Sequence, residues 1–202
     1  MKLQTTLAII RQHRPCTSGW ENLLRHLGPN YPQDKVIDFG TILESNGLDG
    51  ALWGLRAVLP EQEKDRDRLA RLFACARAES VLHIWEAKFP DDKRPREIIA
   101  VARRFALGQA TQEELSAAGA AGAAALAAAG EVAGDAAWAA AWAAWAAAGA
   151  AGEVAWDAAW TAAWAAGAAG EVAGAAGEVA GVAFKDKFIL YFCTDAKDGG
   201  IA

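Results

Sequence analysis

The chain lacks the features of a disulfide-bonded or membrane-inserted protein. Its three cysteines, Cys16, Cys75 and Cys193, are far apart and odd in number, so they do not form a disulfide framework. The N-terminal residues MKLQTTLAIIRQHRP lack the long apolar run and the small-residue cleavage site of a signal peptide. The alanine-rich part has no strongly apolar, charge-free stretch of the about 18 residues that a membrane helix needs. We therefore expect a cytoplasmic chain with no membrane partner.

Lysine and arginine are absent from residues 117–183, and only acids provide charge there. These acids are the predicted acidic flank: Glu131, Asp135, Glu153, Asp157, Glu171 and Glu178. The preceding 116 residues carry 17 basic and 16 acidic residues, and the formal net charge of the chain is −5. Because nucleic-acid-binding proteins usually present a basic stripe, we do not expect a nucleic-acid partner.

The first 110 residues predict a small all-α domain of short helices joined by turns. The patterns favour helices within residues 16–28, from about Leu48 to Val58, across residues 60–89, and across residues 91–108. Ile98, Ile99, Val101, Ala102 and Phe105 form the expected buried side of the last of these helices. The segment KVIDFGTIL has strand character but no evident partner, so we assign it to a loop or a short helix.

Two pairs of residues have the spacing of a capping box, in which a hydroxyl side chain and a glutamate satisfy the first amides of a helix. Ser18 and Glu21 form one pair, with Gly28 as the stop signal of that helix. Thr111 and Glu114 form the other pair, at the beginning of the alanine-rich part, and Gly108 ends the helix before it. Both pairs predict helix starts.

A repeat of 22 residues runs through the alanine-rich part, where GEVAGDAAWAAAWAAWAAAGAA is followed by GEVAWDAAWTAAWAAGAAGEVA. Glycine and tryptophan exchange at two aligned positions, Gly134 with Trp156 and Trp145 with Gly167. From Gly119 to Gly181 the glycines, Leu126 and the tryptophans recur in 17 steps over 62 residues, a mean of 3.65. This is the α-helical period, so these residues share one helix face, which we call the stripe. Its tryptophans are Trp138, Trp142, Trp145, Trp156, Trp160 and Trp164.

The predicted fold is all-α, with a small N-terminal helical domain followed by a long Ala-rich helix, either single or folded back as a hairpin. The expected divisions are residues 1–110, the Ala/Gly/Trp-rich repeat 111–193, and a tail 194–202. The stripe continues through Phe184, Phe188 and Tyr191 or Phe192. A single helix from Gln112 to Cys193 would be on the order of 120 Å long. Because exposed apolar patches of this size are normally buried, the stripe predicts self-packing, with a homo-oligomer expected.

Several segments resemble a family of bacterial and phage immunity proteins, those of the Imm5 type. The resemblance rests on TILESNGLDGALWGLRAV and on RLARLFACARAESVLHIWEAKFPDDKRPREIIAVARRFALGQATQEELSAA, and covers roughly residues 36–165. It implies a small helical domain that leads into an Ala-rich tract, and neutralisation of a partner toxin or a role in phage–host conflict. It brings no catalytic residues. This chain departs from the family pattern because its stripe has glycines where arginines are expected, and because its tract is acidic.

Short motifs that suggest chemistry have simpler structural interpretations. DFG at residues 38–40 lacks the other kinase motifs, and His13 with Cys16 lacks the further ligands of a zinc site. Asp91 and Asp92 lie beside three basic residues and fit a solvated helix start. We therefore expect no enzyme, no catalytic residue, no cofactor and no metal site.

The sequence leaves two functions open. The first is a non-enzymatic protein-binding protein that neutralises or sequesters an unknown toxin or host factor. The second is a structural, self-associating helical module that forms a dimer or a filament without a heterologous target. The tryptophan stripe can be a self-packing core or a partner-recognition surface with aromatic anchors flanked by acids.

Overall fold

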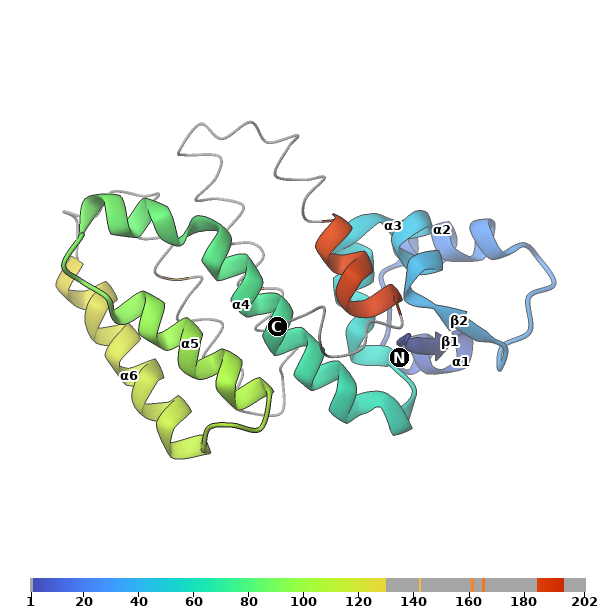
Figure 1. The fold of residues 1–202 in the computed structure, drawn as a ribbon. Helices are drawn as coiled ribbons and strands as arrows, with labels where there is room; N and C mark the ends of the chain where they lie inside the picture. Colours follow the sequence, from blue (N-terminus) through green and yellow to red (C-terminus); the bar gives the residue numbers. More distant parts are fainter. Residues whose placement is uncertain (1, 130–141, 143–160, 162–164, 166–184, 195–202) are drawn as a thin grey trace. The chain divides into compact units, whose positions relative to one another are not determined.

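The computed structural model describes residues 2–129, 142, 161, 165 and 185–194, and it is all-α apart from one small sheet. The chain forms two compact units, and each is described by itself. The first unit contains Met1–Arg66 and Lys185–Ala202, and the second contains Asp67–Phe184. Figure 1 labels the helices and strands of both. The predicted divisions at residues 110 and 193 stay predictions.

The first unit contains a two-stranded antiparallel sheet that corrects one sequence prediction. Strand β1 (Gln4–Thr6) pairs with β2 (Val36–Asp38), with Thr5 opposite Ile37. The segment KVIDFGTIL is therefore not a loop or a helix throughout, because its beginning is the second strand. The partner strand comes from the N-terminus, about thirty positions earlier, where three residues are too few to show an alternating pattern.

Two helices of the first unit lie between its strands along the chain, and a third follows β2. The N-cap of helix α1 (Leu7–Gln12) is Thr6, whose hydroxyl accepts from the Ile9 amide at 3.2 Å. Helix α2 (Thr17–Leu27) ends at Gly28, as predicted. Its predicted capping box is wrong, because Cys16 is the N-cap and Ser18 already lies inside the first turn.

Helix α3 (Phe39–Gly54) is interrupted at Gly47, where φ is 70° and ψ is −175°. Only glycine adopts this backbone conformation readily. The part after Gly47 matches the predicted helix, and the part before it begins at Phe39, inside the segment assigned to a loop or short helix. Two 3-10 turns, η1 (Leu55–Ala57) and η2 (Pro60–Gln62), complete this region.

The core of the first unit combines both ends of the chain. Leu3, Phe39, Phe188 and Phe192 are all fully buried, and the rings of the two C-terminal phenylalanines are 4.7 Å apart. The Leu3 amide donates to the carbonyl of Phe192 at 3.2 Å, which ties strand β1 to the π-helical turn η4 (Ile189–Cys193). The apolar positions predicted to continue the stripe at Phe188, Tyr191 and Phe192 are therefore buried.

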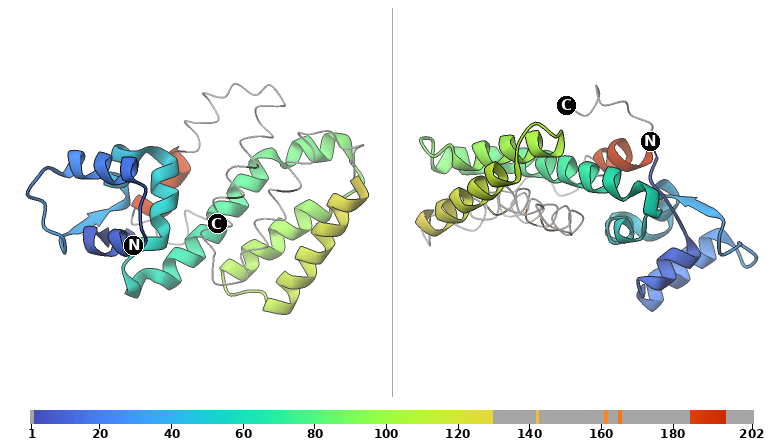
Figure 2. Two further views of the ribbon diagram at one scale, coloured as in Figure 1. Left: turned by 180° about the vertical axis from the view of Figure 1, so that it is seen from behind. Right: turned by 90° about the horizontal axis from the view of Figure 1, so that it is seen from below.

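The second unit is a layer of helices α4 (Glu63–Lys88), α5 (Arg94–Ala106) and α6 (Gln112–Ala129), of which α4 begins within the first unit. Figures 1 and 2 both show α5 and α6 side by side and antiparallel. The capping box at the start of α6 is confirmed. The Thr111 amide donates to Glu114 at 2.7 Å, and the Glu114 amide donates to the Thr111 hydroxyl at 3.2 Å.

Candidate functional site

One tryptophan of the stripe, Trp142, lies among the residues that the structure describes. Its side chain is half-buried and packs against the hydrophobic cluster of the second unit. Two earlier members of the stripe, Gly122 and Leu126, are buried, and Gly119 is half-buried. Gly122, Leu126 and Trp142 of the stripe therefore face the chain's own core, whereas a Cβ atom at Gly119 would meet open space. The tryptophans Trp138, Trp145, Trp156, Trp160 and Trp164 lie outside the described residues, as does the whole acidic flank.

The cluster that receives Trp142 comes from all three helices of the layer. Helix α4 supplies small residues and one large ring, since Cys75 is fully buried and Trp85 is only 1 % exposed. The Trp85 indole nitrogen donates to the carbonyl of Asp92 at 3.3 Å, which fixes the ring under the α4–α5 connection. The full set is Ala74, Cys75, Ala78, Val81, Leu82, Trp85, Ile98, Ile99, Ala102, Leu115, Ala125 and Leu126.

Three positions that are far apart in the sequence reach this one cluster. Leu126 belongs to it, and Trp142 and Ala165 pack against it. In one straight helix, Leu126 and Ala165 would be about 58 Å apart, whereas the cluster residues of α4 span about 17 Å of helix axis. Both positions contact one cluster, and the predicted alternatives of a single or a folded-back helix concern residues outside the described part of the chain. The path of the chain between them lies outside the described residues.

Paired charges join α4 to α5 at a regular spacing. Arg96 donates through Nε and Nη2 to the two carboxylate oxygens of Glu86, both at 2.7 Å. One heptad away on each helix, Arg103 donates to Glu79 at 2.7 Å. The residue numbers of both pairs add to the same sum, as expected for two antiparallel helices. The hydrogen bond from Arg96 also lowers the pKa of Glu86 below its ordinary value.

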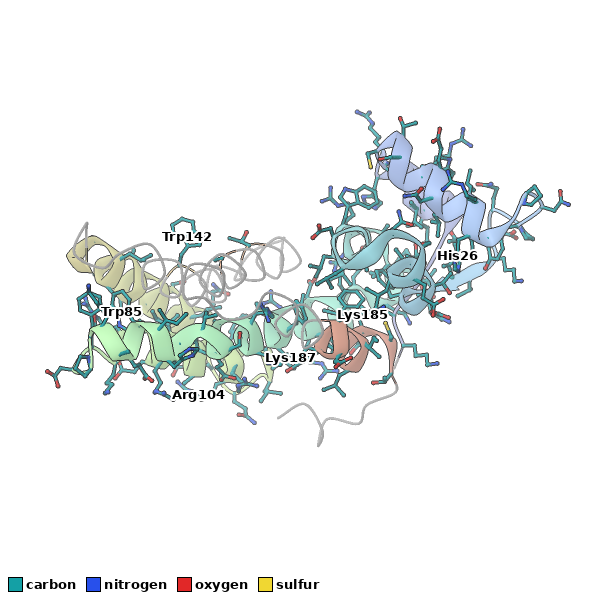
Figure 3. The ribbon with its side chains drawn as sticks, turned by 90° about the horizontal axis from the view of Figure 1, so that it is seen from above. His26, Trp85, Arg104, Trp142, Lys185 and Lys187 are labelled. Carbon is teal, nitrogen blue, oxygen red and sulfur yellow. The ribbon has the colours of Figure 1, made fainter. Side chains whose placement is uncertain are left out.

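A shallow groove of about 360 Å³ lies between α4 and α5 beside these pairs. Its apolar floor includes Leu82, Ile99 and Ala100. Glu79, Arg96, Arg103 and Arg104 line the rest of the groove, and each of these arginines forms an ion pair with a glutamate. In the view of Figure 3, Arg104 and Trp142 lie on opposite sides of α4. The layer thus carries a partly covered tryptophan on one side and arginines around an apolar floor on the other.

Residues with possible chemistry take structural positions in the first unit. Asp38 of the DFG triplet is the N-cap of α3, and its carboxylate accepts from the Thr41 amide at 2.9 Å. Cys16 caps α2, and its sulfur lies 3.6 Å from the Ser18 hydroxyl, which lowers the pKa of the thiol. Burial, followed by the charges of Arg56 and Arg66, lowers the pKa of His13.

The second unit places its two remaining candidates in equally structural roles. Asp92 accepts from the Arg94 side chain at 2.8 and 2.6 Å, and this bonding lowers the pKa of Asp92. Burial raises the pKa of Cys75 to about 12, so its thiol is a poor nucleophile. Across the described ranges, no group of three His, Cys, Asp or Glu residues is placed to hold a metal ion.

The arginines of the groove were not predicted as a site from the sequence. The signal was present, because Glu79 and Glu86 are seven residues apart and so are Arg96 and Arg103. The connection between α4 and α5 has five residues, which requires an antiparallel pair. Together the two spacings place acids opposite arginines.

No helix in the described part of the chain has the length and apolar character needed to cross a membrane. Comparison with protein-family models, curated proteins and solved structures gave no match to this chain. The resemblance to immunity proteins of the Imm5 type therefore stays a prediction.

Proposed function

We propose that the chain is a non-enzymatic binding protein that sequesters or neutralises a partner protein, as an immunity or phage–host-conflict factor does. The observation that carries the proposal is the packing of Trp142 against the chain's own cluster. We infer that the other tryptophans of the stripe pack internally, as Trp142 does. The side chains beside the stripe are then the surface available to a partner.

The chemistry of this surface favours a basic partner. In a helix each acid of the flank is rotated about 100° from the stripe residue before it, because 3.6 residues complete a turn. The tract offers six carboxylates and no lysine or arginine to neutralise them. Complementary charge increases the rate of association and the specificity of a complex, and its effect decreases with added salt.

Charge-neutral variants of the full-length chain test this proposal. Glu153→Gln combined with Asp157→Asn removes two charges of the flank, and Glu61→Gln combined with Asp91→Asn removes two charges elsewhere. Each protein is immobilised, exposed to host lysate at low and high salt, and the bound proteins are identified by mass spectrometry. We expect the flank variant to lose a basic protein that the parent and the control retain, with an unchanged melting temperature. Capture of the same protein by all three chains would show that the flank does not recognise it.

A structural, self-associating module is the second candidate function, and Gly119 is the observation that favours it. A Cβ atom added at Gly119 would meet no atom within 4 Å, so α6 has open space there for a second helix. Light scattering over a range of concentrations separates the two functions. A monomer at all concentrations would exclude self-association, and a dimer that captures no other protein would exclude the sequestering function.

A further inference from the structure

Residues 185–194 complete the first unit from the far end of the chain. The rest of this unit ends at Arg66, and the intervening residues 67–184 belong to the second unit. The segment packs against α3, as Figure 1 shows for the part drawn in red, and the Leu3 amide donates to the Phe192 carbonyl at 3.2 Å. The first unit is therefore assembled from two stretches of chain that are connected only through another unit.

The buried side chains of this C-terminal segment share one helix face. Phe188 and Phe192 are fully buried and Tyr191 is 5 % exposed, whereas Leu190 is 39 % exposed. Residues three and four positions apart lie on the same side of a helix, so the three rings are buried together. Aromatic side chains are common anchors where a short amphipathic helix binds in an apolar groove. The segment therefore has the character of a ligand bound to the first unit.

The segment depends on this docking surface for its shape. Five of its residues form the π-helical turn η4. Turns of this kind are rare, and helical segments of this length are marginal in water by themselves. Contacts with the first unit therefore stabilise the turn and keep its rings out of water. The docking surface of a second copy, which has the same sequence, offers the same contacts.

We propose that the first unit also accepts residues 185–194 from a second copy, so that two copies exchange their C-terminal segments and form a dimer. Exchange of an identical element preserves its contacts, which makes it a low-cost route to a dimer. A segment tethered by even a short flexible linker reaches an effective concentration of only about 1 mM, so concentrated protein favours the exchange. The dimer gives the self-associating candidate function a specific contact, and it uses neither the acidic flank nor Gly119.

Disulfide trapping between two full-length variants tests the exchange. The first variant carries Lys2→Cys, Cys16→Ser and Cys193→Ser, and the second carries Cys16→Ser and retains Cys193. Position 2 and Cys193 adjoin the bonded pair Leu3 and Phe192, and the charge of Lys2 reaches the Cys193 thiol. The two variants are unfolded together in urea, refolded and mildly oxidised. We expect a disulfide-linked heterodimer that is at least about fivefold more abundant at about 500 µM chain than at about 5 µM.

A reporter cysteine elsewhere controls for random collisions. Glu21→Cys, in place of Lys2→Cys, puts the thiol at an exposed position of α2. We expect this control to give less than about a fifth of the heterodimer, because exchange does not bring Cys193 to α2. Mass spectrometry of the linked peptides identifies the positions that are joined.

A synthetic peptide of the segment, with Cys193→Ser, competes for the same surface. In excess it should suppress the heterodimer, whereas the peptide that also carries Phe188→Asp and Phe192→Asp should not, because charged side chains are not buried without partners. Light scattering of the unmodified chain at about 500 µM is a second measurement that needs no variant, and the same peptide should convert its dimer into a monomer.

Three results would overturn the proposal. They are absence of the heterodimer from correctly folded variants, equal yield with Glu21→Cys, and failure of the peptide to compete. A dimer in light scattering that resists the peptide would leave self-association in place and still overturn the exchange. The flank variant with Glu153→Gln and Asp157→Asn should exchange as the parent does, so this test is independent of the proposed flank.

Discussion

The substitution Gln62→Glu exchanges one amide nitrogen for an oxygen at a buried position of the first unit. Gln62 is 7 % exposed, and its side chain bridges two backbone groups at the N-terminus of the chain. Its Oε1 accepts from the Gln4 amide at 2.8 Å, and its Nε2 donates to the carbonyl of Lys2 at 3.0 Å. The side chain thus pairs with the edge of β1 as a neighbouring strand would. Glutamate can replace the first bond but not the second.

The expected cost follows from the group left without a partner. In Gln62→Glu the Lys2 carbonyl loses its donor and faces a carboxylate oxygen instead. A buried acceptor without a partner costs about 1–3 kcal/mol, and partial burial of the carboxylate adds to this. We therefore expect the free energy of unfolding to fall by about 2–4 kcal/mol at neutral pH.

Urea unfolding followed by circular dichroism measures this loss, and its pH dependence tests the cause. Burial raises the pKa of the introduced carboxyl in the folded state above its unfolded value. The deficit is therefore largest above that raised pKa. It shrinks as the pH falls to about 4, because the protonated acid can donate to Lys2. A loss no greater than about 0.5 kcal/mol, as expected for the exposed control Gln109→Glu, would refute the bridging role.

Two further predictions concern thiol reactivity and the ion pairs of the helical layer. In the folded chain, a thiol reagent should modify Cys16 well before Cys75, because Cys16 is exposed and has a lowered pKa whereas Cys75 is buried. Equal modification rates of the two thiols, measured by mass spectrometry, would contradict the burial of Cys75. Arg96→Gln should lower stability slightly at pH 7 but not in acid, because the lowered pKa of Glu86 stabilises the fold only while the carboxylate is charged. This contribution is lost as the pH falls through the pKa of Glu86 in the folded chain. A stability loss of Arg96→Gln that persists in denaturation curves at about pH 2 would therefore assign the effect to packing.

Local signals were sufficient to predict most of the helical layer. Helix α4 ends at Lys88 shortly before Pro90, and Gly108 has the positive φ of 72° that ends α5. Thr111 and Glu114 form their reciprocal bonds because each partner lies within four residues of the other. These features depend on neighbours in the sequence, which is why composition and spacing were sufficient.

Features that depend on distant residues were not predicted. Strand β2 exists because Val36–Asp38 finds a partner at Gln4–Thr6, and neither three-residue segment shows a period by itself. At α2 the extended backbone of Cys16, with ψ at 151°, places the helix start one residue before Ser18. The groove required both the heptad spacing of the charges and the antiparallel pairing of α4 with α5. The packing of Trp142 and Ala165 against the cluster of the second unit likewise depends on distant residues, which no local pattern supplies.

The most direct test of the account is the stability of Trp142→Ala, measured together with its capture of the partner. Truncation of a completely buried tryptophan to alanine lowers the free energy of unfolding by about 3–5 kcal/mol. Because the ring of Trp142 is half-buried, we expect Trp142→Ala to lower it by about half of this. We expect this loss in urea unfolding, with an intermediate loss for Trp142→Phe. We also expect unchanged capture at temperatures where the variant is folded. Unchanged stability with lost capture would make Trp142 a recognition residue and contradict its role in internal packing.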